Sequence, residues 1–93
     1  MAKKPAGWVV YVLLCADGTL YTGITTDPER RVVQHNAGTA SKYTRARRPV
    51  ALAYTESSPD RSAASKREAA IKALTRKQKD KLIRRPHATD TPV

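Results

Sequence analysis

The amino-acid sequence predicts an α+β domain in which a β-hairpin is followed by a helix, a third strand and two further helices. An apolar, β-branched run at residues 8–15 precedes an Asp-Gly turn signal, which indicates a strand that enters a hairpin. Two later segments, 26–29 and 58–60, combine a capping side chain with proline, which is typical of a helix start. The short segment 50–55 between them is predicted as the third strand.

The turn of the hairpin decides whether two tyrosines can act together. Tyr11 belongs to the first strand and Tyr21 to the second. A two-residue Asp-Gly turn would place them on opposite faces of the sheet, because side chains alternate along a strand. A three-residue loop at 16–18, with Gly18 in the left-handed conformation, pairs Tyr11 with Gly23 and puts both phenols on one face. We predict the three-residue loop.

The first helix is predicted to run from Pro28 to about residue 36, with Gly38 closing it. Arg31 and His35 are four residues apart and therefore lie on the same face of this helix, beside Val32. That face packs against the sheet. Both polar side chains are thus expected to point inward rather than into solvent.

The second half of the chain is read as a basic loop at 39–49, the third strand and two helices. The longer helix is expected to end near residue 74, and Glu68 flanks its apolar side. That side is defined by Ala63, Ala64, Ala70, Ile71 and Leu74. A capping-box pattern at 75–78 opens a short last helix, which carries Leu82 and Ile83 inward.

Ninety-three residues are enough for one hydrophobic core, so a single domain over 1–93 is predicted, with its core at about 8–83. Segments 1–6 and 86–93 are expected to be flexible. The single cysteine, Cys15, cannot form an internal disulfide and is expected as a small buried hydrophobe. No signal peptide or apolar run of about 20 residues is present, so a cytoplasmic monomer away from membranes is expected.

The net charge of +10 comes from the residues after 29, because residues 1–29 hold two basic and three acidic side chains. Residues 42–48 contain four basic side chains and no acid, and residues 61–85 contain ten basic side chains against two acids. Such a surface attracts polyanions, of which nucleic acid is the commonest in a cell. The four basic residues of the first group, Lys42, Arg45, Arg47 and Arg48, are predicted to contact phosphates.

Five polar residues are candidates for chemistry: Tyr11, Tyr21, Arg31, His35 and Glu68. A phenol titrates near pH 10, so a catalytic tyrosine needs a neighbouring cation or metal ion. Arg31 can supply charge and stabilise a pentacovalent phosphate, and His35 can relay a proton. A carboxylate such as Glu68 can hold one Mg²⁺.

Each of these residues also has an ordinary structural interpretation. The tyrosines can be core residues of the hairpin, Arg31 can form a surface ion pair, and Glu68 can pair with Lys72 one helical turn away. The sequence contains no Cys/His cluster for zinc, no glycine-rich phosphate loop and no nucleophile elbow.

The set of motifs resembles the GIY-YIG nuclease superfamily over about residues 8–83. The two tripeptides that name the family correspond to Val10-Tyr11-Val12 and to Tyr21-Thr22-Gly23, in which Thr22 replaces isoleucine. The helix with Arg31 and the following Gln34-His35-Asn36 is the more specific match. The small, stand-alone bacterial members are the most similar in appearance, because they share the pattern of Arg48-Pro49 and Lys66-Arg67-Glu68.

The resemblance implies a sheet of three antiparallel strands flanked by helices and a metal-dependent cleavage of phosphodiester bonds. It makes Tyr11 or Tyr21 the base or nucleophile, Arg31 the transition-state stabiliser, His35 an auxiliary group and Glu68 the ligand of Mg²⁺ or Mn²⁺. Our hypothesis is an endonuclease for branched or broken DNA, in repair or recombination. The alternatives are a nucleic-acid-binding module that cleaves weakly or with a partner, and an RNA- or ribosome-associated basic protein.

Overall fold

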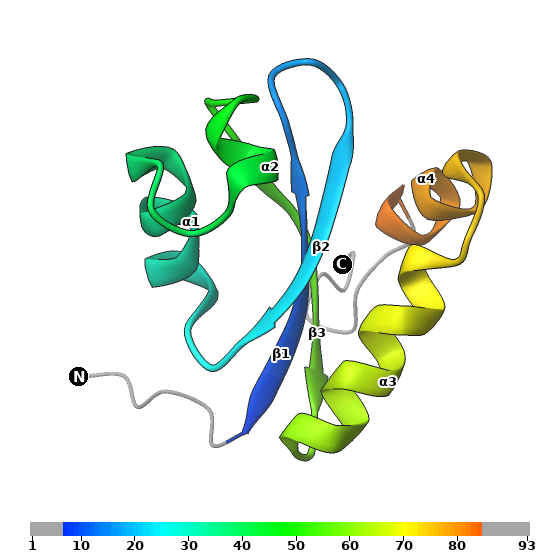
Figure 1. The fold of residues 1–93 in the computed structure, drawn as a ribbon. Coiled ribbons are helices and arrows are strands. Elements are labelled where there is room, and N and C mark those ends of the chain that lie inside the picture. The colour runs from blue at the N-terminus through cyan, green and yellow to red at the C-terminus, as the bar shows by residue number, and fades with distance from the viewer. Residues whose placement is uncertain (1–6, 85–93) are drawn as a thin grey trace, which may run out of the picture.

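Three antiparallel strands form one sheet in the order β2-β1-β3, in a computed structural model that describes residues 7–84 (Figure 1). The strands are β1 (Trp8–Leu14), β2 (Leu20–Thr25) and β3 (Ala51–Ser58). β1 is the central strand, which explains why its sequence is apolar on both faces. The α+β class and the predicted sheet are confirmed.

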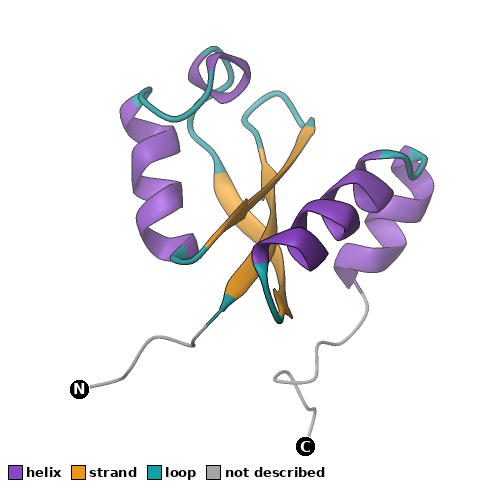
Figure 2. Ribbon diagram, turned by 60° about the horizontal axis from the view of Figure 1, so that its bottom comes forward, coloured by secondary structure: helices purple, strands orange, loops and turns teal. Residues whose placement is uncertain are grey.

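Helices cover both faces of this sheet. They are α1 (Pro28–Ala37), α2 (Lys42–Arg45), α3 (Arg61–Lys72) and α4 (Arg76–Arg84). Figures 1 and 2 show α1 and α2 on one side of the sheet and α3 and α4 on the other. No helix within the described range is long and apolar enough to cross a membrane.

Alternate residues of β1 face two separate hydrophobic clusters. Val10 and Val12 pack with Ile71 of α3 and Leu82 of α4 on one face. On the other face, Tyr11 and Leu13 pack with Cys15 and Val50, and Val32 of α1 borders the cluster. The second cluster therefore contains the candidate catalytic tyrosine, and Cys15 is a buried hydrophobe as predicted.

The hairpin has the three-residue loop that the sequence predicts. Tyr11 lies opposite Gly23 and Leu13 lies opposite Tyr21. The backbone N–H of Cys15 donates to the carbonyl of Thr19 at 2.9 Å, and Gly18 has φ of 87°, in the left-handed region. The two tyrosines consequently share one face of the sheet.

α1 begins and ends where its capping residues predict, to within one residue. The carboxylate of Asp27 accepts a hydrogen bond from the backbone N–H of Arg30 at 3.2 Å, and Pro28 opens the first turn. Gly38 ends the helix with φ of 84°. At this end, Asn36 forms two hydrogen bonds with the backbone of Val50, which donates at 2.8 Å and accepts at 3.0 Å.

The prediction of a basic loop over the whole of 39–49 was wrong, because this segment contains the one-turn helix α2. The hydroxyl of Ser41 caps it and accepts from the backbone N–H of Tyr43 at 3.1 Å. A single turn is too short to show a hydrophobic period, so only the capping serine signals it in the sequence.

Two element boundaries also differ from the prediction. β3 begins at Ala51 and continues to Ser58, past the expected end at residue 55, because its last residues pair with the start of β1. α3 ends at Lys72 rather than near residue 74, and Ala70, expected on its core side, is exposed. Pairing partners and helix rotation are set by the whole fold and are not visible in a local pattern.

The capping box at the start of α4 is confirmed. The backbone N–H of Thr75 donates to the side-chain oxygen of Gln78 at 2.9 Å, and the N–H of Gln78 donates to the Thr75 hydroxyl at 3.1 Å. Leu82 is buried and Ile83 packs beside the core, as predicted. The segments 1–6 and 86–93, expected to be flexible, lie outside the described residues.

We predict that Asn36→Ala lowers the free energy of unfolding by about 1–3 kcal/mol, since two hydrogen bonds of about 0.5–1.5 kcal/mol each are lost. Urea denaturation followed by circular dichroism measures this change. Ala37→Ser, on the neighbouring exposed position, is the control and should change stability by less than about 0.5 kcal/mol. A neutral Asn36→Ala would show that α1 is held to β3 by other contacts.

Candidate active site

Tyr11 is buried under the side chains that surround it. Its ring lies directly over Gly23, where an added Cβ atom would come within 2.6 Å of the phenolic oxygen. Only 1% of Tyr11 is exposed, whereas Tyr21 is partly exposed. The two rings have centroids 6.5 Å apart and are tilted by 43°. The missing side chain of Gly23 is therefore what allows the Tyr11 ring to occupy its place.

His35 joins the tyrosines from α1. Its Nε2 atom lies 2.9 Å from the Tyr11 hydroxyl, and its Nδ1 atom lies 2.7 Å from the hydroxyl of Thr44 in α2. The imidazole also packs edge-on against Tyr21, with centroids 5.1 Å apart. Since His35 is 1% exposed and Thr44 is 0% exposed, bulk water does not compete for these hydrogen bonds.

Arg31 lies one helical turn before His35 and is partly buried. Its Nη1 atom donates to the side-chain oxygen of Gln34 at 2.8 Å. Its Nε atom is buried and makes no hydrogen bond within residues 7–84. A small pocket of about 190 Å³ opens beside it, lined by Thr25, Thr26, Asp27, Arg30, Arg31 and Gln34. A buried hydrogen-bond donor without a partner, next to a pocket, can bind an anionic ligand by donating to it.

The electrostatic environment of the Tyr11 hydroxyl involves the other candidate residues. Burial raises the pKa of Tyr11, a hydrogen bond and the positive charge of Arg31 oppose that rise, and electrostatic interactions with Tyr21 and with the Glu68 carboxylate add to it. The Tyr11 hydroxyl therefore has one hydrogen-bond partner at a defined distance, His35, and is influenced electrostatically by the other three candidates. The phenol is protonated at neutral pH.

The pKa of His35 is shifted in the opposite direction. Burial lowers the pKa of the imidazole, and the charge of Arg31 lowers it further. His35 is therefore neutral at pH 7, and one of its two ring nitrogens carries a free lone pair. A neutral imidazole next to a protonated phenol can accept a proton.

Glu68 lies in a different layer of the fold from the other four candidates. It belongs to α3, which packs on the sheet face opposite to Tyr11 and runs against β2 and β1. Its side chain is 22% exposed and lies 3.0 Å from the ammonium nitrogen of Lys72. The intrahelical pair considered from the sequence is thus present, and it coexists with the electrostatic influence of Glu68 on Tyr11.

A single carboxylate fits Mg²⁺, which commonly takes one or two protein carboxylates and fills its other positions with water and phosphate oxygens. The partial exposure of Glu68 leaves room for such ligands. Within residues 7–84, no three His, Cys, Asp or Glu side chains gather around one point. Glu68 is therefore the residue that would hold the ion, with water and substrate as the other ligands.

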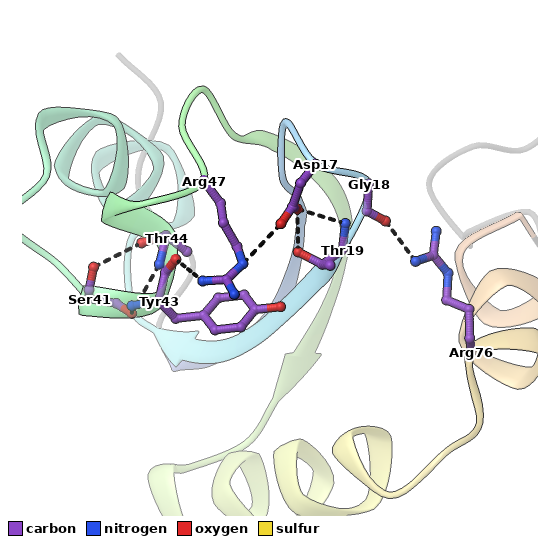
Figure 3. A network of polar contacts seen from close by, with 8 residues as sticks. All are labelled: Asp17, Gly18, Thr19, Ser41, Tyr43, Thr44, Arg47 and Arg76. Atoms are coloured by element: carbon purple, nitrogen blue, oxygen red, sulfur yellow. Dashed lines mark hydrogen bonds and ion pairs between the residues drawn. The ribbon is translucent and has the colours of Figure 1, made fainter.

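Tyr43 and Arg47 support the site from the basic segment. The ring of Tyr43 stacks on Tyr21 with centroids 5.8 Å apart, and the Arg47 guanidinium lies 3.8 Å from the centre of the Tyr43 ring. Arg47 also forms an ion pair with Asp17 of the hairpin loop at 3.0 Å. Figure 3 shows Arg47 between Asp17 and Tyr43. The hairpin loop and α2 are thereby held together.

The four basic residues predicted to contact phosphate fall into two groups. Arg47 is occupied by Asp17 and Tyr43, and Arg48 donates to the carbonyls of Arg45 and Asn36 at the ends of α2 and α1. Lys42 and Arg45 are exposed and form no ion pair in the described part of the chain. Those two are the better placed for phosphate contacts.

The sequence prediction missed three residues that touch the site, namely Thr44, Tyr43 and Gln34. Thr44 and Tyr43 are adjacent in a segment that was read as a loop, and each contacts a different catalytic candidate. The capping serine before them is the available signal, because it places both residues in one helical turn. Gln34 sits three residues after Arg31, a spacing at which helical side chains meet.

Comparison with known proteins adds a family match. The sequence profile of the GIY-YIG catalytic domain matches residues 7–81. A UPF0213 protein of Enterococcus faecalis is 56% identical over 79 residues, which cover 83% of this chain and 90% of that protein. A UPF0213 protein of Halobacterium salinarum is 58% identical over 74 residues, covering 80% of this chain and 96% of that protein.

Two solved structures have the same fold. The solution NMR structure of a protein from E. faecalis is 53% identical, with a TM-score of 0.55, and covers 81% of this chain and 80% of that one. The solution NMR structure of a UPF0213 protein from Bacillus halodurans is 42% identical, with a TM-score of 0.53, and covers 82% of this chain and 81% of that one.

We predict that Gly23→Ala disrupts the site and the packing around Tyr11. The new methyl group would lie 2.6 Å from the phenolic oxygen, so the ring must move away from His35. Overpacking of this kind costs about 1–3 kcal/mol of stability. The measurement is urea denaturation together with the NMR shift of the His35 imidazole.

Gly18→Ala is the matched control, because nothing lies within 4 Å of its added Cβ and only the left-handed backbone is strained. It should cost about 1–2 kcal/mol and leave the His35 signal unchanged. An unchanged His35 signal in Gly23→Ala would contradict the packing argument.

Stability should fall as the pH decreases from 7.5 to 5. The unfolded chain binds a proton at His35 near pH 6.5, and the folded chain binds it only at a lower pH because its pKa is lowered. The unfolded state therefore gains protons first, and the free energy of unfolding decreases until the folded pKa is passed. Denaturation of the wild type and of His35→Gln over this range tests it. A slope that is equal in both proteins would refute the assignment to His35.

Proposed function

Because the chain belongs to the GIY-YIG family, we propose that it is a metal-dependent endonuclease that hydrolyses phosphodiester bonds in DNA. The hydrogen bond between the buried Tyr11 hydroxyl and Nε2 of His35, with Tyr21 packed against the same imidazole, is the observation that supports this function best. A buried polar cluster of this composition has no need to exist for stability alone, since an apolar cluster of the same volume serves the core equally well.

In this proposal Tyr11 is the general base and His35 accepts its proton. The O–H bond of Tyr11 breaks as Nε2 of His35, 2.9 Å away, takes the proton. The phenolic oxygen then takes a proton from the water whose oxygen attacks the phosphorus, and the bond from phosphorus to the strand's 3′ or 5′ oxygen breaks, with that oxygen keeping the electron pair and taking a proton from solvent. The opposite pKa shifts of the two groups keep the pair neutral until water and phosphate are in place.

Arg31 binds the phosphate that is cleaved. Its buried Nε donor has no partner within residues 7–84, and the adjacent pocket gives a phosphate oxygen access to it. An arginine held in place by Gln34 stabilises the additional negative charge of a pentacovalent phosphorus at little reorganisation cost. Tyr21 is partly exposed and packs against His35, one helical turn from Arg31.

Glu68 would hold the divalent ion, Mg²⁺ or Mn²⁺, which would supply Lewis-acid stabilisation of the phosphate oxygens. Lys72 must release the carboxylate for this role, and its side chain is 54% exposed, so it can turn into solvent. The cost of breaking such an exposed pair is about 0–1 kcal/mol.

Lys42 and Arg45 contact the DNA backbone near the site in this proposal, since both are exposed beside α2. Backbone contacts carry no sequence information, and the described residues present little surface for reading base edges. We therefore propose recognition of strand breaks and branches, as in repair or recombination, rather than recognition of a sequence.

A binding module that cleaves weakly or only with a partner is the second candidate. It is favoured by one observation, the ion pair with Lys72 that occupies Glu68, the carboxylate proposed to hold the metal ion. Both candidates predict that DNA binding weakens steeply with salt. They differ in whether the purified protein cuts DNA when Mg²⁺ is added.

We predict that the purified protein with Mg²⁺ cuts nicked, flap or branched DNA and that chelation stops the reaction. Tyr11→Phe and Glu68→Gln should lower the single-turnover rate by about 10²–10⁴-fold, because each removes a group of the chemical step. DNA affinity, measured by fluorescence anisotropy, should change by less than about threefold, because phosphate contacts provide most of the binding.

Tyr54→Phe is the matched control. Tyr54 is also buried and also loses a phenolic hydrogen bond, to Glu56, but it lies in the cluster on the opposite face of the sheet. Its rate should equal that of the wild type. Tight binding without any cut strand would support the binding module instead, and preferential competition by RNA would favour the RNA-associated alternative.

A further inference from the structure

A series of buried hydrogen bonds runs from Tyr11 through His35 to α2. The proposed function does not use the last side chain in this series, the hydroxyl of Thr44. Thr44 is 0% exposed and lies 2.7 Å from Nδ1 of His35. Its oxygen also lies 3.4 Å from the carbonyl of Ser41, which is a long hydrogen bond. The direction of each bond in this series determines what His35 can do.

The donor-to-acceptor direction of these hydrogen bonds follows from the groups around the Tyr11 hydroxyl, at one end of the series. Arg31, which interacts with the phenolic oxygen, can only donate hydrogen bonds, so it cannot take the phenolic proton. Nε2 of His35 is the hydrogen-bond partner of this hydroxyl in residues 7–84. If Nε2 carried a proton, the buried Tyr11 proton would have no acceptor, which costs about 1–3 kcal/mol. Nε2 must therefore present its lone pair.

The other ring nitrogen then carries the proton. Nδ1–H donates to Thr44 Oγ1, and the Thr44 hydroxyl turns its own proton to the carbonyl of Ser41. Every donor in the series from Tyr11 to Ser41 meets an acceptor in this arrangement. The reverse arrangement, with Thr44 donating to Nδ1, leaves Nε2 protonated and the phenol unsatisfied.

We propose that Thr44 is a positioning residue that holds His35 in the Nδ1–H tautomer, so that Nε2 is free to accept the proton of Tyr11. This inference rests on the proposed function for its effect on cleavage, but the tautomer itself exists whether or not the protein cuts DNA. It also gives the one-turn helix α2 a role, because Ser41 caps that helix and fixes the Thr44 backbone beneath the imidazole. Figure 3 shows the contacts of Ser41 with Thr44 and Tyr43.

The experiment combines a tautomer measurement with kinetics on the full chain. His87→Gln removes the other histidine of the sequence, so that a long-range ¹H–¹⁵N correlation spectrum reports His35 alone. We expect the Nδ1–H pattern in this background at pH 7.5. Thr44→Ser keeps the hydroxyl and should keep the pattern, whereas Thr44→Val keeps the shape and should shift the population toward Nε2–H.

The single-turnover rate with Mg²⁺ should fall about 10–100-fold in Thr44→Val and stay near the wild-type rate in Thr44→Ser, as is typical for partners that orient a reacting group. DNA affinity should be equal in the two variants, which a general loss of structure would not allow. An Nε2–H tautomer in the wild type overturns the inference, even if Thr44→Val fails to fold. A normal tautomer and rate in Thr44→Val overturns it as well.

An inactive wild type with the Nδ1–H tautomer would count against the endonuclease and leave the positioning role of Thr44 intact. An active wild type whose rate does not depend on the Thr44 hydroxyl would count against the positioning role and leave the endonuclease intact. The two failures are therefore distinguishable.

Discussion

The register of the hairpin between β1 and β2 is the constraint on which the site depends. The three-residue loop, with Gly18 at a φ of 87°, sets Tyr11 opposite Gly23. The ring of Tyr11 can then lie over a position without a side chain and extend to His35. A register shifted by one residue would send Tyr11 or Tyr21 to the other face, among the aliphatic side chains beneath α3 and α4.

Burial gives this cluster its chemical character. Tyr11 and His35 are each 1% exposed, and burial disfavours the charged form of both. The pKa of the Tyr11 phenol is therefore raised and the pKa of the His35 imidazole is lowered. The groups that border them, Tyr21, Arg31 and Glu68, are only partly buried. The site thus has a neutral, buried interior and a polar, partly accessible rim that includes the charged groups of Arg31 and Glu68.

Part of the basic segment after α1 has a structural role. Arg47 and Arg48 tie α2 to the hairpin loop and to the end of α1, while Lys42 and Arg45 face solvent. A run of like charges can therefore contain both residues that hold elements of the fold together and residues that face solvent. Burial, ion pairs and hydrogen bonds separate them, and composition does not.

Much of the site was already determined by the sequence alone. The loop at Gly18, the caps Asp27 and Gly38, and the helical spacing of Arg31 and His35 are local features, so the shared face of the tyrosines and the inward His35 could be predicted. Local patterns suffice there because turns, caps and helix faces depend on residues within a few positions of one another.

Tertiary structure decided the contacts between distant segments. The hydrogen bond of Thr44 to His35, the stack of Tyr43 on Tyr21 and the extension of β3 to Ser58 each join parts of the chain that no sequence period connects. The electrostatic influence of Glu68 on Tyr11 likewise depends on how α3 packs against the sheet. Such contacts follow from the packing of whole layers, which is a property of the complete fold and not of any local segment.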